Sequence, residues 1–213
     1  WVNSDGLSRA DRRALIAVAT QFFVNGALFA SFVPRLPEIR DRIGIGTNTL
    51  GILLAVGALA GVLGSAMVGR LIERFGTRRM LIGAGVALCA SLPLIGFATL
   101  PAMLVVGLAL MSIFDVLVDS AMNLQGSWIS ARRSAPVMNR LHGLWSLGTV
   151  VGGLAAAQLA GARVSLRWHL FAVACVMLCV VLFVGRGLLR VDEHPDLPDA
   201  APDPSPLPRR HLS

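Results

Sequence analysis

The sequence contains few charged residues and no lysine. Charged side chains make up 15% of its 213 residues, whereas an ordinary soluble domain has about 25%. All 19 basic residues are arginines, and the net charge is +7. The arginines stand at the ends of apolar blocks and form no basic face with interleaved aromatic side chains, so we expect no nucleic-acid partner.

Motifs of metal, redox and enzyme chemistry are also lacking. There is no CxxC pair and no Cys/His cluster with zinc spacing. HExxH, GxSxG and a phosphate-binding glycine loop do not occur either. We therefore predict no enzyme activity, no metal and no cofactor. The cysteines Cys89, Cys175 and Cys179 lie inside apolar blocks, where we expect them to be small buried residues.

Long apolar blocks dominate the chain. Hydrophobic residues make up 55% of it, and its mean hydropathy is +0.70. A helix needs about 20 apolar residues to cross about 30 Å of hydrocarbon, and the alternating polarity of membrane strands is absent. We therefore predict an all-α membrane protein with six transmembrane helices, which satisfy their own backbone hydrogen bonds in lipid. The six blocks are residues 14–34, 49–72, 80–99, 101–124, 141–162 and 166–189.

The segments outside the blocks are polar. Residues 1–13 are predicted to be an N-terminal cytoplasmic segment that precedes a six-helix unit of residues 14–189. Residues 35–48 and 125–140 are predicted to be connectors. Residues 190–213 are rich in Pro, Asp and Ala, and such a segment cannot bury enough apolar surface to fold alone. We expect it to be a disordered tail or linker.

The distribution of arginines predicts the orientation. If the N-terminus is cytoplasmic, the inner segments up to residue 190 hold twelve arginines and the outer loops hold five. Cytoplasmic loops of membrane proteins carry an excess of Lys and Arg. We therefore predict a multi-pass protein of the cell (inner or plasma) membrane. Six spans return the chain to its starting side, so both termini are expected to be cytoplasmic.

The turn between the second and third blocks carries a motif. Its sequence over residues 69–79 is GRLIERFGTRR. An acid at a helix end can accept hydrogen bonds from a neighbouring helix N-terminus, and arginines hold a loop at the anionic cytoplasmic surface. A glycine permits a tight reversal of the chain. The motif residues are Gly69, Glu73, Arg74, Gly76, Arg78 and Arg79.

This turn resembles the signature loop of the major facilitator superfamily (MFS), in which Gly, x, Leu, x, an acid, Arg, an aromatic residue, Gly and basic residues follow in order. Glu73 stands where the family usually has Asp. Residues 32–39, 119–126 and 139–148 are similar to a branch of bacterial inner-membrane members, mostly of unassigned substrate and loosely related to fucose permease. The resemblance covers roughly residues 14–189.

Family members have twelve helices in two six-helix halves. The resemblance therefore implies that this chain is the N-terminal half of an MFS fold, built from two inverted three-helix repeats. The motif turn would then govern conformational change rather than contact a solute. Two departures argue against a drug:proton antiporter. The fourth block lacks the Arg of many proton-coupled members, and residues 148–153 lack the Pro of the drug-antiporter signature.

Polar residues inside the blocks are few. An ionisable residue at the centre of a span costs at least about 2.5–3.5 kcal/mol and is therefore a candidate for function. Asp115 and Asp119 share one face of the fourth block, and Gln21 and Asn25 share one face of the first. In the family, these two helices are repeat counterparts that line the central cavity. The alternative role is hydrogen bonding that joins helices.

The two aspartates are candidates to bind a proton and a solute. Two carboxylates on one face in low dielectric cannot both ionise cheaply, so one of them is a candidate to bind and release a proton. Asp119 is the preferred coupling residue, since the family-like stretch starts there. Asp115 lies nearer the midplane and is the better candidate to contact a solute. Asn123, one turn beyond Asp119, is included in the candidate site.

Small residues recur at helix-contact spacing. Gly57, Gly61 and Gly64 line one face of the second block, and Gly148 and Gly152 repeat the spacing in the fifth. Such rows let helix backbones approach closely. We expect tight packing within one bundle, and a dimerisation face is the alternative.

Histidine and tryptophan open the last two blocks. His142 and Trp145 begin the fifth near its cytoplasmic end, where we expect interfacial packing. Trp168 and His169 begin the sixth at its outer end, where amphipathic rings act as membrane-surface anchors.

These features together predict a secondary transporter, or half of one, that moves a small polar solute across the membrane by alternating access, with protons as a candidate coupling ion. The expected partners are membrane lipid, the solute and a second six-helix half. The alternative is a non-transporting truncated remnant or an accessory membrane subunit. The missing second half favours that alternative, whereas the retained polar residues oppose it.

Overall fold

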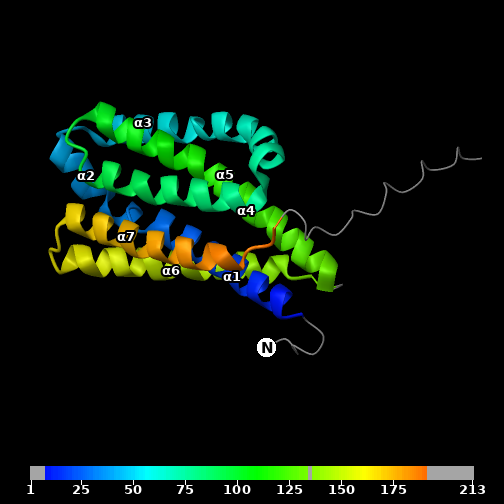
Figure 1. The fold of residues 1–213 in the computed structure, drawn as a ribbon. Coiled ribbons are helices and arrows are strands. Elements are labelled where there is room, and N and C mark those ends of the chain that lie inside the picture. The colour runs from blue at the N-terminus through cyan, green and yellow to red at the C-terminus, as the bar shows by residue number, and fades with distance from the viewer. Residues whose placement is uncertain (1–7, 134–135, 191–213) are drawn as a thin grey trace, which may run out of the picture.

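The computed structural model describes residues 8–133 and 136–190, and in these two ranges it contains helices and no strand (Figure 1). The predicted tail lies outside the described residues apart from Arg190, as do the first seven residues. The long helices are α1 (Arg9–Ala30), α3 (Thr47–Leu59), α4 (Gly61–Gly96), α5 (Pro101–Arg133), α6 (Met138–Gly161) and α7 (Leu166–Val184). The short ones are η1 (Val33–Arg35), α2 (Leu36–Ile43) and η2 (Gly185–Gly187).

Helices α3 and α4 together cross the membrane twice. Their run from Thr47 to Gly96 covers 50 residues, or about 75 Å at 1.5 Å per residue, which is more than twice the hydrocarbon thickness of about 30 Å. The chain reverses at Gly76, whose φ of 74° and ψ of 159° are non-helical and favour glycine. Figure 1 shows the two arms folding back at this turn. The five long apolar segments thus give six spans, as predicted.

The first and fifth spans pack backbone against backbone. Helix α1 lies along α6, and a Cβ added at Gly148 would overlap the carbonyl oxygen of Phe23. A Cβ added at Gly152 would overlap the carbonyl oxygen of Ala27 in the same way. The glycine row of the fifth block is therefore a helix contact inside one bundle, as predicted.

The second and fourth spans repeat this arrangement. A Cβ on Gly57 would lie 2.5 Å from the Cβ of Leu108, and one on Gly64 would lie 2.7 Å from the carbonyl oxygen of Ile113. Under the inverted repeat the first span corresponds to the fourth and the fifth to the second. The two glycine rows thus occupy corresponding contacts, which is the packing expected of two inverted three-helix repeats.

Helix boundaries differ from the block boundaries in three places. Helix α1 already begins at Arg9, because the Ser8 hydroxyl caps it by accepting a hydrogen bond of 3.0 Å from the Asp11 backbone N–H. Helix α5 continues to Arg133, through much of the predicted connector. The other connector contains α2, which ends at Gly44 with a φ of 74°. Apolar composition defines the depth of a span, whereas capping and turn residues define where its helix stops.

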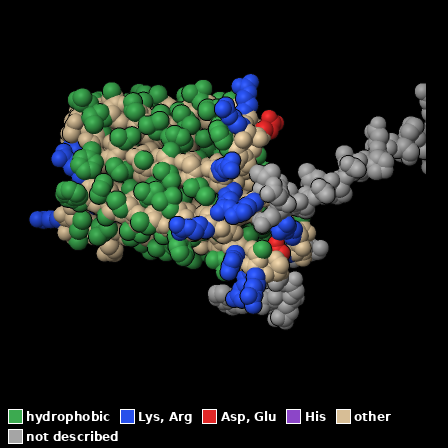
Figure 2. Space-filling model, in the orientation of Figure 1, with side chains coloured by type: hydrophobic (Ala, Val, Ile, Leu, Met, Phe, Trp, Pro, Cys, Tyr) green, Lys and Arg blue, Asp and Glu red, His purple; other side chains and the backbone are tan. Residues whose placement is uncertain are grey.

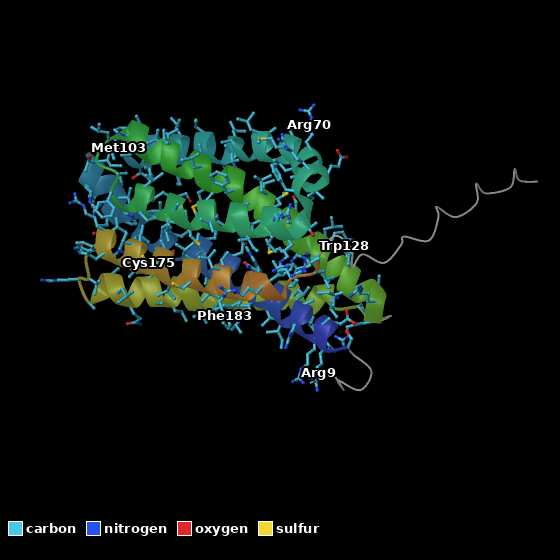
Figure 3. The ribbon with its side chains drawn as sticks, in the orientation of Figure 1. Arg9, Arg70, Met103, Trp128, Cys175 and Phe183 are labelled. Carbon is cyan, nitrogen blue, oxygen red and sulfur yellow. The ribbon has the colours of Figure 1, made fainter. Side chains whose placement is uncertain are left out.

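The surface is apolar around the middle and basic at one end. Figure 2 shows hydrophobic side chains over most of the visible face and arginines gathered toward the end at which α1 begins. In Figure 3, Arg9, Arg70 and Trp128 lie toward that end, and Met103 lies at the opposite one. The N-terminus of α1 and the motif turn are therefore on the same side of the bundle.

The cysteines do not all have the environment we predicted. Cys89 is buried, but Cys175 and Cys179 are exposed on α7. The prediction of burial is thus wrong for these two. An apolar side chain that faces lipid gains nothing from burial in protein, because hydrocarbon is as apolar as a core.

Candidate functional site

A chain of hydrogen bonds joins three spans at Asp115. The Asn25 Nδ2 of α1 donates to the Asp115 Oδ1 of α5 at 2.6 Å. The Trp145 Nε1 of α6 donates to the Asn25 Oδ1 at 2.8 Å. Asn25 is 5% exposed, and the other two residues are half-buried. Residues that are 90 and 120 positions apart in the sequence thus form one polar network.

The order of donors in this network has a chemical reason. An indole N–H can only donate, so Trp145 holds the amide oxygen of Asn25 toward itself. The amide NH₂ then points at Asp115 and requires an acceptor there. The network as it stands matches an Asp115 oxygen that accepts, and protonation of Asp115 would replace a charged acceptor by a neutral, weaker one.

Asp115 also lines a cavity. A space of about 230 Å³ lies among α1, the segment that follows it, α3 and α5, and Asp115 is the one ionisable side chain among the described residues that line it. The hydroxyl of Ser112, one turn earlier, is also on the wall and donates to the Ala58 carbonyl at 3.1 Å. The remaining lining residues are Phe29, Phe32, Leu54, Ala58, Leu108 and Met111. The carboxylate is therefore in contact both with the network and with an accessible, mostly apolar space.

Asp119 lies one turn away in a different setting. It is exposed, and its Oδ1 accepts a hydrogen bond of 3.0 Å from the Asn123 Nδ2 of the same helix. The Asn123 amide also donates to the Asp119 carbonyl at 2.8 Å. His142 lies close enough to interact electrostatically with Asp119, and its ring contacts that of Phe22 edge to face at 5.3 Å between centroids. Asp119 is thus hydrogen-bonded within its own helix, and it does not join the Asn25 network.

Gln21 points into the interior of the bundle. Its side chain is 2% exposed, and its Nε2 has no hydrogen-bond partner among the described residues. A void of about 10 Å³ adjoins it, lined also by Asn25, Gly85 and Cys89. This is close to the smallest space that can hold one water molecule. Gln21 adjoins this separate void and is not among the residues that line the cavity beside Asp115.

A basic residue of the motif turn binds a neighbouring segment, whereas its acidic residue has no partner in the described ranges. The Arg78 Nε donates to the Gly185 carbonyl of η2 at 3.1 Å, and the Arg74 guanidinium lies 5.3 Å from the Phe75 ring centroid. Glu73 is exposed and makes no hydrogen bond or ion pair with a residue of the described ranges. The motif residues Gly69 and Arg79 are exposed as well.

Sequence reasoning missed Gln125, which it placed in a polar connector. Gln125 is fully buried. Its Nε2 donates to the Thr77 Oγ1 at 2.9 Å and to the Leu189 carbonyl at 3.0 Å, while its Oε1 accepts from the Leu189 N–H. These bonds join α5 to the motif turn and to the segment that follows η2. Its position in the family-like stretch 119–126 was the only signal that could have found it.

Two aromatic interpretations need correction. Trp145 is not merely packed at the interface, since its N–H holds Asn25. His169 is 4% exposed and is not a surface anchor, unlike its neighbour Trp168, which is 66% exposed. One helical turn spans 3.6 residues, so adjacent positions face different surroundings. Residue type and position along the chain therefore could not distinguish the buried His169 from the exposed Trp168.

The end of the bundle opposite the motif turn holds a buried arginine. Arg35, which was expected in an outer loop, is 2% exposed. Its Nη2 donates to the Glu38 carboxylate at 2.6 Å and to the Val164 carbonyl at 2.7 Å. The bond to Val164 joins η1 to the turn between α6 and α7. Within the described ranges no three His, Cys, Asp or Glu side chains gather to hold a metal ion.

Comparison with known proteins agrees with this architecture. The profile of the Major Facilitator Superfamily matches residues 18–212. An uncharacterized MFS-type transporter of Yersinia pestis is 27% identical over 84% of this chain and 47% of its own length. The membrane protein MosC of Rhizobium meliloti is 26% identical over 82% of the chain and 41% of its own length. The multi-drug resistance efflux pump PmrA of Streptococcus pneumoniae is 26% identical over 65% and 35%.

The chain spans less than half the length of these relatives. The match to the family covers most of the chain and all six spans apart from the start of the first. The reversal at Gly76, the glycine-lined contacts between corresponding spans and the apolar surface belt are features of the same architecture. The chain is a multi-pass membrane protein that belongs to the Major Facilitator Superfamily.

Proposed function

We propose that this chain is the N-terminal half of a secondary transporter that moves a small polar solute by alternating access and couples the movement to protons through Asp115. The observation that carries the proposal is the network from Trp145 through Asn25 to Asp115, beside a cavity of about 230 Å³. A second six-helix half, which the length of the relatives supports, would complete the cavity.

Protonation of Asp115 would change the contacts among three spans. The ionised carboxylate accepts the Asn25 amide and so links α5 to α1, and through Trp145 to α6. Protonation makes this acceptor neutral and weakens that link. A ligand can shift a conformational equilibrium only by its different affinities for the two states, and this link supplies such a difference. The structure therefore favours Asp115 over Asp119 for coupling, because Asp119 bonds within its own helix.

The cavity wall suits a solute with one polar or cationic group. Asp115 supplies a charged acceptor, and Phe29, Phe32 and Met111 supply an apolar surface. Sites of this kind orient a ligand by a few polar groups within an apolar lining. Asp115 would then serve both proton and solute, which bind in turn.

The experiment is uptake into membrane vesicles by the chain together with its second half. A solute panel is tested with and without an imposed pH gradient. We expect accumulation above the external concentration only with the gradient, by about tenfold per pH unit for one proton per solute. Equilibration that is indifferent to the gradient would contradict proton coupling, and no movement of any solute would contradict transport.

The orientation with both termini in the cytoplasm is part of the proposal. The arginines gather at the end where α1 begins, which is the side expected to face the cytoplasm. Single cysteines are introduced at the exposed positions Asn48, Ala162 and Asn139 in a background in which the native cysteines are replaced by alanine. A membrane-impermeant thiol reagent should label the first two in intact cells, and the third only after the membrane is opened. Labelling of Asn139→Cys in intact cells would reverse the orientation.

The motif turn is proposed to bias the conformational equilibrium without contacting the solute. Glu73 is exposed and has no hydrogen-bond or ion-pair partner among the described residues, and an acid that meets a helix N-terminus contributes about 0.3–1 kcal/mol. Glu73→Ala should therefore slow transport on the order of two- to fivefold with little change in the apparent KM. Asp41→Ala, an exposed carboxylate at the other end, is the control and should transport like the parent. A raised KM with unchanged turnover would instead place Glu73 in solute binding.

A further inference from the structure

A groove on the outside of the bundle has an apolar floor and a basic rim. It encloses about 670 Å³ at the end where α1 and α6 meet the end of α5. Leu15 and Ala19 of α1 and Leu144 of α6 supply apolar lining, while Arg133 and Arg140 are its only ionisable lining residues in the described part of the chain. The groove is separate from the cavity beside Asp115, with which it shares no lining residue.

The groove faces away from the candidate transport site. At 100° per residue, Arg140 and Leu144 each lie about 160° around α6 from His142. His142 lies about 60° around α6 from Trp145, whose N–H binds Asn25 of the candidate site. The groove therefore opens on the opposite flank of α6, which also carries the exposed apolar side chains of Leu147 and Val151.

The two arginines have unused hydrogen-bonding capacity. Arg133 is half-buried at the end of α5 and Arg140 is exposed in the first turn of α6, and neither forms a hydrogen bond or ion pair with any residue of the described ranges. The preceding residue, Arg132, differs, since its Nη1 binds the Asp11 carboxylate at 2.6 Å. No side chain caps the N-terminus of α6, so its backbone N–H groups add partial positive charge at the same place.

We propose that this groove binds one anionic phospholipid. Guanidinium groups match the oxygens of a phosphate in paired hydrogen bonds, and the apolar floor matches an acyl chain. A zwitterionic lipid would bring a cationic head group toward two arginines, so an anionic head group fits better. The site lies at the end of the spans, where the phosphates of a bilayer are found.

Lipid binding to the purified chain in neutral detergent is measured by native mass spectrometry. Dioleoyl-phosphatidylglycerol is titrated against dioleoyl-phosphatidylcholine. We expect one phosphatidylglycerol to bind at least about tenfold more tightly than phosphatidylcholine. The double variant Arg133→Gln with Arg140→Gln should weaken phosphatidylglycerol binding by about 30-fold, at roughly fivefold per arginine. Arg12→Gln with Arg13→Gln removes the same charge from exposed positions outside the groove and should change the Kd by less than about twofold.

A second variant tests the groove without changing charge. Gly143 lines it, and a Cβ at this residue would meet nothing within 4 Å. Gly143→Phe should therefore fold, fill the groove and abolish the phosphatidylglycerol preference. The proposal would be overturned if the parent bound both lipids with equal affinity, or if the Arg12/Arg13 control lost as much phosphatidylglycerol affinity as the Arg133/Arg140 variant. It would also be overturned if Gly143→Phe bound phosphatidylglycerol like the parent. Displacement of the lipid by millimolar inorganic phosphate would show a free-phosphate site instead and would also overturn it.

Discussion

Asp115→Asn should abolish proton-driven accumulation of solute while solute exchange across the membrane continues. Asparagine keeps the shape of the side chain and its hydrogen bond with Asn25, which is 2.6 Å long in the parent, but it cannot titrate. Exchange needs no net proton movement, so it should persist. With one proton per solute, the parent should accumulate about tenfold per pH unit of gradient, and the variant should stop at equilibrium.

Companion variants locate the coupling residue. Asp119→Asn should accumulate solute like the parent, because Asp119 bonds within α5 and is outside the Asn25 network. Trp145→Phe removes the donor that orients Asn25 and should shift the pH dependence of uptake without eliminating accumulation. If Asp119→Asn alone lost accumulation, the coupling residue would be Asp119, as the sequence had favoured. If both aspartate variants accumulated like the parent, proton coupling through this helix face would be wrong.

Gly148→Leu should prevent the chain from reaching a stable folded state. The α-carbon of Gly148 lies against the backbone of Phe23, with no space for a Cβ, so any side chain would force α1 and α6 apart. Overpacking costs about 1–3 kcal/mol for added methylenes that meet side chains, and here the added atoms meet backbone. Separation of the two helices would also pull Trp145 away from Asn25, which would leave buried polar groups unpaired at about 1–3 kcal/mol.

The measurement is the yield of monodisperse protein in detergent and its thermal midpoint. Gly148→Ala should lower the Tm on the order of 5–10 °C, as a loss of about 2–3 kcal/mol implies for a chain of this size, and Gly148→Leu should give little folded protein. Gly83 is the control, since it lies within α4 and a Cβ there would meet nothing within 4 Å. Gly83→Leu should fold like the parent. A Gly148→Leu variant as stable as Gly83→Leu would mean that the close crossing of α1 and α6 is not needed for the fold.

Local sequence was sufficient for the spans, the family and the residues worth attention. Block length predicts a helix that crosses a bilayer, because hydrocarbon thickness sets the number of apolar residues required. The motif turn predicts the reversal, which occurs at Gly76. Glycine spacing predicts close helix contacts, and they occur at Gly148 and Gly152. Each of these signals is contained within a few turns of one helix.

The partners of the polar residues were decided only by tertiary packing. The sequence placed Asn25 and Gln21 on one helix face as equivalent candidates, yet Asn25 bonds to Asp115 and Gln21 points into the interior. It read Trp145 as packing, because nothing near it in the sequence reveals that Asn25, 120 residues away, lies within 2.8 Å. Helical periodicity gives the angle of a side chain about its own axis. Which neighbour occupies that direction depends on how six helices pack around one another, and that arrangement is set by contacts between distant segments rather than by any single one of them.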